Sequence, residues 1–133
     1  MRRYNVSEAP RSVLANDLGE LIRREEHLNP DRPDRAESYR RALAEIEMGA
    51  PAAMARRTEF RVNEDCTRRY GVSDGTREEL LAELDRYRSD RNKEGREEKA
   101  RLIARAMADL EQLDVTEVLV ERVVYRVVEV VED

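Results

Sequence analysis

The sequence predicts an all-α fold, a bundle of about five helices with a short extended segment near residues 58–62. Two observations support this prediction. Charged residues make up 41% of the 133-residue chain and aromatic residues only 5%, a composition typical of long helices with solvated outer faces. Apolar residues also recur at steps of three and four over most of the chain, which is the period of an amphipathic helix.

The first part of the chain is predicted to form a helical hairpin. Ser7 is placed as the N-cap of a first helix, which ends at Asn29–Pro30 because the residue before a proline disfavours helical geometry. Asp34 is placed as the cap of a second helix, which ends at Gly49.

The middle of the chain is less regular. We predict a short helix over residues 52–55, an extended segment over residues 58–62, where apolar and polar residues alternate, and another short helix over residues 63–70. Thr76 and Glu79 then form a capping box before a further helix. The next helix carries apolar residues as far as Leu113. No internal repeat is recognised along the chain.

Residues 114–133 hold nine valines and one leucine, the densest apolar stretch of the chain. Valine favours strands, but charged residues at steps of three and four, and adjacent apolar pairs such as Val123 and Val124, indicate an amphipathic C-terminal helix. The alternative is an α+β fold in which residues 115–131 form strand with both faces buried.

As a helix, this stretch has coiled-coil heptads and divides the chain into a helical domain, residues 1–113, and an oligomerisation segment, residues 114–133. The other interpretation is that the apolar residues of this stretch pack only on the protein's own helices. The residues predicted to form the oligomer interface are apolar residues of these heptads. They are Leu113, Val120, Val123, Val124, Val127, Val130 and Val131.

Residues suited to catalysis or metal binding are scarce. The chain has one histidine, His27, and one cysteine, Cys66, so a four-ligand zinc site cannot form within it. The five glycines match neither a dinucleotide-binding nor a phosphate-binding loop. We therefore expect a protein that is not an enzyme and binds no cofactor or metal.

One segment suggests a second function. Residues 63–84 have the spacing of a helix-turn-helix, and the words Tyr-Gly-Val-Ser and Gly-Thr-Arg within them resemble those of GntR-type bacterial regulators. The resemblance covers about fifteen residues and implies that the second helix enters the DNA major groove. It departs from the family at Thr67 and Arg77, and acidic residues lie on the implied reading face. The candidate DNA contacts are Arg68, Arg69, Ser73, Thr76 and Arg77.

Charge and targeting signals bear on partners and location. The formal net charge of −5 does not favour nucleic acid, and no apolar run of membrane-spanning length occurs. The single cysteine indicates a reducing compartment, so we expect a cytoplasmic protein or one assembled there into a particle. The leading hypothesis is a non-enzymatic, homo-oligomeric assembly or adaptor component of a larger particle or regulatory complex. Its alternative is a DNA-binding transcriptional regulator.

Overall fold

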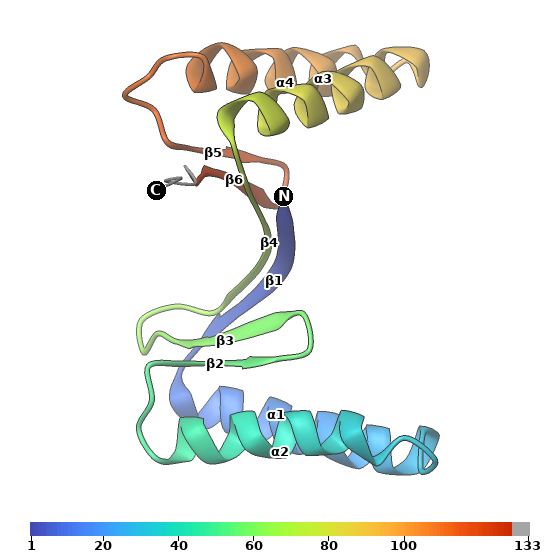
Figure 1. Ribbon diagram of the computed structural model, residues 1–133, viewed down its shortest axis with the longest axis vertical. Coiled ribbons are helices and arrows are strands. Elements are labelled where there is room, and N and C mark those ends of the chain that lie inside the picture. The colour runs from blue at the N-terminus through green and yellow to red at the C-terminus, as the bar shows by residue number, and fades with distance from the viewer. Residues whose placement is uncertain (129–133) are drawn as a thin grey trace, which may run out of the picture. The chain divides into compact units, whose positions relative to one another are not determined.

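The computed structural model describes residues 1–128, and in that range the fold is α+β, with four helices and six strands (Figure 1). The all-α prediction is therefore wrong, and the α+β alternative fits, with strands at Glu117–Val120 and Val123–Val127 within the segment that it named. The elements in chain order are β1 (Arg2–Ala9), α1 (Arg11–Leu28), α2 (Pro33–Glu47), β2 (Ala52–Ala55), β3 (Thr58–Val62), β4 (Arg68–Gly75), α3 (Arg77–Lys93), α4 (Glu97–Leu110), β5 (Glu117–Val120) and β6 (Val123–Val127).

The chain divides into two compact units. We call Tyr4–Tyr70 the N-terminal module and Gly71–Asp133 together with Met1–Arg3 the C-terminal module. The first residues of β1 thus belong to the C-terminal module, and the first residues of β4 belong to the N-terminal one.

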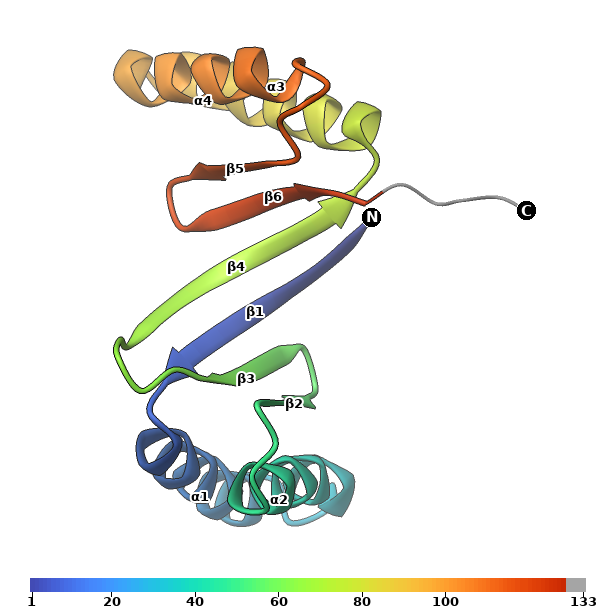
Figure 2. The same cartoon turned by 90° about the vertical axis from the view of Figure 1, so that its left-hand side faces the viewer.

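In the N-terminal module, β3 lies between β1 and β2. It pairs in parallel with β1, where Ser7 is opposite Phe60, and antiparallel with β2, where Ala53 is opposite Phe60. Helices α1 and α2 form a hairpin against these strands (Figure 2). The core between helices and strands consists of apolar side chains from every layer, Ala9, Leu14, Leu18, Ala42, Ile46, Ala53, Ala55 and Phe60.

The C-terminal module repeats this arrangement. Strand β6 pairs in parallel with β4, where Ser73 is opposite Tyr125, and antiparallel with β5, where Val118 is opposite Tyr125. Helices α3 and α4 form the second hairpin (Figure 2). Its core consists of Leu80, Leu84, Ile103, Ala106, Leu110, Val120 and Tyr125.

The two modules are therefore copies of one β-α-α-β-β unit, and the prediction that the chain has no internal repeat is wrong. The repeat is visible in the sequence as Arg-Arg-Tyr-x-Val-Ser, at residues 2–7 and again at residues 68–73. Helical leucines follow at matching positions, Leu14 and Leu18 in the first copy and Leu80 and Leu84 in the second, and all four are fully buried.

Matched residues also make matched contacts. At the start of α1, Arg11 donates hydrogen bonds to the carbonyl oxygens of Ile46, in the last turn of α2, and Ala50, just beyond it. Its counterpart Arg77 does the same to Leu110 and Val115 around the end of α4. Each arginine satisfies carbonyl groups that a helix C-terminus leaves without partners, which ties the two helices of its module together.

The predicted helices with clear end signals are confirmed, with shifted starts. Helix α1 ends at Leu28, α2 ends two residues before Gly49, and α3 begins with the predicted capping box of Thr76 and Glu79. Ser7 and residues 52–55 were wrongly predicted, since both lie in strands. The extended segment over residues 58–62 is confirmed as β3.

The described part of the C-terminal stretch forms a β-hairpin. The helical period in its sequence is misleading because it runs across the turn of this hairpin. Glu121 and Arg122 connect β5 to β6, and Glu121 has a left-handed backbone with φ of +58°. On either side of this turn successive residues alternate between faces, as strand geometry requires, so Val118, Val120, Val123 and Val127 share the face toward the core. The coiled-coil prediction is accordingly wrong for the part of residues 114–133 that the structure describes, residues 114–128.

Candidate interaction surface on the C-terminal module

Among the strands that residues 1–128 form, β5 is the last of its module, so one of its edges is open to strands of that range. Val127 donates a backbone hydrogen bond to the carbonyl oxygen of Thr116 at 2.8 Å, so the even-numbered residues of β5 bond to β6. Backbone groups alternate in direction along an antiparallel strand. The N–H and C=O groups of Glu117 and Leu119 therefore point to the open edge, where another strand could pair with them.

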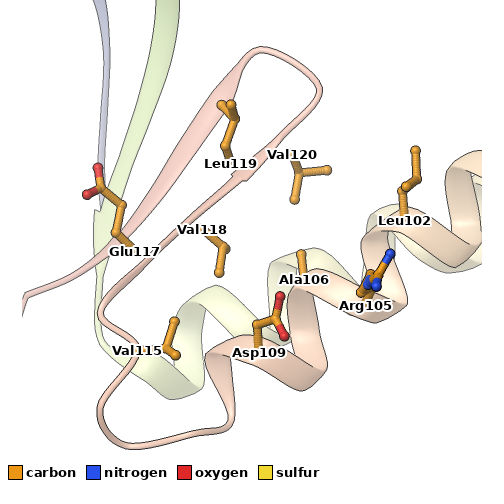
Figure 3. Close-up of a pocket in the computed structure, with 9 residues that line it drawn as sticks. All are labelled: Leu102, Arg105, Ala106, Asp109, Val115, Glu117, Val118, Leu119 and Val120. Atoms are coloured by element: carbon orange, nitrogen blue, oxygen red, sulfur yellow. The ribbon is translucent and has the colours of Figure 1, made fainter.

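A groove lies between this strand and helix α4 (Figure 3), with a volume of about 390 Å³. Most of its lining is apolar, and the apolar residues are Leu102, Ala106, Val115, Val118, Leu119 and Val120. Two of them are unusually exposed for leucine, Leu119 at 66% and Leu102 at 62%. The groove and the open edge together form what we call the β5 surface.

The charged residues of the β5 surface are separated along the groove. Asp109 lies near Val115, at the end where β5 begins, whereas Arg105 lies one helical turn away, toward Leu102 (Figure 3). Glu117 adds a second carboxylate at the start of the strand. One end of the surface is therefore acidic and the other is basic.

The N-terminal module differs at the matching strand. Strand β2 reads Ala-Ala-Met-Ala where β5 reads Glu-Val-Leu-Val, so Met54 takes the place of Leu119. Met54 is 41% exposed. The larger, branched apolar residues at the hairpin edge thus occur only in β5 of the C-terminal module, and the β-α-α-β-β fold does not require them.

The residues predicted to form an oligomer interface have several different environments. Leu113 is exposed in the connection between α4 and β5, and Val120 is buried in the core. Val123 and Val127 pack against that core, and Val124 is half-buried. Val130 and Val131 lie outside the described residues. The structure therefore brings Leu113, Val120 and Val123 into one module without placing them on one face.

Leu119 is not among the residues predicted to form a contact, because a helical pattern conceals the alternation of a strand. The composition Glu-Val-Leu-Val at residues 117–120 is the signal that could have identified the edge, since alternate residues of a strand lie on opposite faces.

The candidate DNA contacts do not lie in a helix-turn-helix, because residues 63–67 form a loop and Arg68–Gly75 is strand β4, so the predicted helix over residues 63–70 is wrong. Arg68 donates to Glu8 at 2.6 Å, Arg69 lies 3.6 Å from Asp17, and Ser73 is buried. Thr76 caps α3, and Arg77 binds the carbonyl groups described above. Arg68, Arg69 and Arg77 therefore each interact with a group of their own module, and Thr76 caps a helix of its own module.

Glu8 is the centre of a buried polar cluster in the N-terminal module. Its carboxylate accepts a hydrogen bond from Arg68, lies 3.9 Å from Arg61, and contacts the Cys66 thiol at 3.7 Å. Burial alone would raise the pKa of Glu8, but the hydrogen bonds and charges of Arg68, with help from Asn63 and Arg61, outweigh burial and lower it. Glu8 is thus a charged structural residue rather than a proton donor.

A different buried polar cluster, in the C-terminal module, contains Glu83, which is 5% exposed and pairs with Arg3. Tyr87 donates a hydrogen bond to Glu83 at 3.0 Å, while the second carboxylate oxygen of Glu83 is buried without a partner. Nearby, burial and then the negative neighbours Tyr87 and Glu83 raise the pKa of Tyr125 to about 12. Glu83 and Tyr125 are both buried, and Tyr125 belongs to the core of the module.

Within residues 1–128 no group of three or more histidine, cysteine, aspartate and glutamate side chains is arranged to hold a metal ion. In the same range, none of the helices has the length and apolar character needed to cross a membrane. Comparison with protein-family models, curated proteins and solved structures found no match to this chain. Its function must therefore be inferred from its own geometry.

Proposed function

We propose that this protein is a non-enzymatic interaction protein that associates with a further copy of itself, as an assembly or adaptor component of a larger particle or regulatory complex. The observation that carries the proposal is the β5 surface, where the exposed Leu102 and Leu119 border an open strand edge. Exposed apolar side chains next to unpaired backbone groups favour burial by another polypeptide.

The free thiol of Cys66 supports location in a reducing compartment such as the cytoplasm. DNA binding is not part of the proposal. Arg68, Arg69 and Arg77 each interact with groups of their own module, and the net charge of −5 would repel a phosphate backbone.

The test is the mass of the protein in solution, measured by sedimentation at concentrations up to about 100 µM, where weak homo-oligomers are populated. We expect the wild-type chain to form an oligomer and Leu119→Glu to be monomeric, because a carboxylate there would be buried at the contact. Met54→Glu, at the matching position of the N-terminal module, is the control and should leave the mass unchanged.

Leu119 is largely exposed, so its substitution should preserve the circular dichroism spectrum and the unfolding temperature of the monomer. A wild-type chain that is monomeric throughout this concentration range would contradict the proposal.

A further inference from the structure

We infer that two copies of this chain associate by antiparallel pairing of β5 with β5 of the second copy, with Val118 on the two-fold axis. This inference rests on the proposed function and specifies its contact. A strand edge, unlike a flat apolar face, restricts the partner to another strand and allows few registers.

The direction of the backbone groups limits the register. Within β5, Glu117 and Leu119 are the residues whose N–H and C=O groups point to the open edge, so we consider the registers in which these two residues form hydrogen-bonded pairs across the contact. Three two-fold registers satisfy this condition. They place Glu117 opposite Glu117, Glu117 opposite Leu119, or Leu119 opposite Leu119 of the second copy.

Charge selects one of the three. Pairing Glu117 with its own copy sets two carboxylates directly opposite each other, which is destabilising in a sheet. Pairing Leu119 with its own copy sets Glu117 opposite Glu121, which is again acidic and lies in the turn beyond the strand. The remaining register pairs Glu117 with Leu119 twice, and each pair exchanges two N–H···O bonds.

The groove favours the same arrangement. Antiparallel two-fold pairing places the acidic end of one β5 surface, with Asp109 and Glu117, beside the end of the other that carries Arg105 and Leu102. Both α4 helices, with Leu102, then lie on one side of the paired strands, and Leu119 points to the opposite side (Figure 3). The β5 surface is therefore complementary in charge to a second copy of itself.

Engineered disulfides test the register. Val118 would face its own copy at a non-hydrogen-bonded site, where Cα atoms are about 4.5 Å apart, within the range that a disulfide spans. With Cys66→Ser as background, we expect Val118→Cys to form a covalent dimer on mild oxidation. Thr116→Cys is the control. It lies on the same face of the hairpin but would face Val120 of the second copy, so it should remain monomeric on a non-reducing gel.

A charge pair gives a second test. In this register residue 119 lies opposite Glu117 of the second copy, so Leu119→Arg should retain the dimer mass that Leu119→Glu loses. If the wild type is dimeric but Val118→Cys does not crosslink, or Leu119→Arg dissociates as Leu119→Glu does, the register is wrong while the proposed function stands. A monomeric wild type overturns both.

Discussion

At the residue scale, burial distinguishes two ion pairs that occupy the same position in the two modules. Arg3 pairs with Glu83, whose side chain is 3% exposed, whereas Arg69 lies 3.6 Å from Asp17, whose side chain is 26% exposed. A buried carboxylate that loses its partner retains the cost of leaving water, while an exposed one is solvated again.

We therefore expect Arg3→Ala to lower the free energy of unfolding by about 1–3 kcal/mol, because Glu83 would stay buried with less compensation. Arg69→Ala should change it by less than about 1 kcal/mol. Urea unfolding of both variants measures the difference. Equal effects would mean that the burial of Glu83 does not determine the strength of its pair.

A second residue-scale prediction concerns alkaline pH. The pKa of Tyr125 is raised to about 12 by burial and by Tyr87 and Glu83, while an unfolded tyrosine ionises near pH 10. Between these values only the unfolded state releases the proton, so the contribution of Tyr125 to stability is lost as pH rises from about 10.

Tyr125→Phe should remove this loss, since Phe60 occupies the matching position of the N-terminal module. The measurements are ultraviolet titration, in which the highest tyrosine ionisation should disappear, and thermal unfolding between about pH 9 and 11. A variant whose stability falls as steeply as that of the wild type would contradict the assigned cause.

At the element scale, two glycines differ in whether the backbone requires glycine. Gly49 follows the C-cap of α2 and has a φ of +100°, a backbone conformation that residues other than glycine rarely adopt. Gly19 lies inside α1, and a Cβ added there would be 3.6 Å from the flexible end of Arg23, which is ordinary contact.

Alanine at these two glycines should therefore act in opposite directions. Gly49→Ala is expected to destabilise the protein by about 1 kcal/mol or more because of backbone strain. Gly19→Ala is expected to stabilise it by about 0.5–1 kcal/mol because alanine favours the helix interior. Thermal unfolding of both variants checks this pair, and a shift of the same sign for both would refute it.

The elements that were predictable from the sequence carry local signals. Helix ends are specified by residues close together in the chain. Examples are the stop at Asn29–Pro30, the stop at Gly49 and the capping box of Thr76 and Glu79. Strands β4 and β6 depend on partners far along the chain, Gly71 pairing with Val123 for example. A period read within one segment does not contain that information, which is why residues 114–128 were predicted as helix.

At the scale of the whole molecule, the repeat acts as an internal alignment of two sequences. Positions kept in both copies, such as Arg11 and Arg77, have the same structural role in each module. Positions that differ between the copies, such as Met54 and Leu119, are not fixed by the shared fold. A function specific to one module can arise at such positions.

That residues 114–133 form a contact surface stays a prediction, and the helical register assigned to this segment is wrong for residues 114–128. Val120 and Val123 are apolar because they complete a core, whereas Leu119 is apolar and exposed. The sequence contains both kinds of residue side by side. Only pairing within the hairpin distinguishes them.

Both modules end in a hairpin with an open outer strand, and this has a consequence for the size of any assembly. If β5 of one copy paired with β2 of the next, the contact would be heterologous and could propagate into a fibre. Pairing of β5 with itself is isologous and uses up that edge in both copies. The alanines of β2 offer little apolar surface for the addition of further copies. Association should therefore stop at an oligomer of defined size.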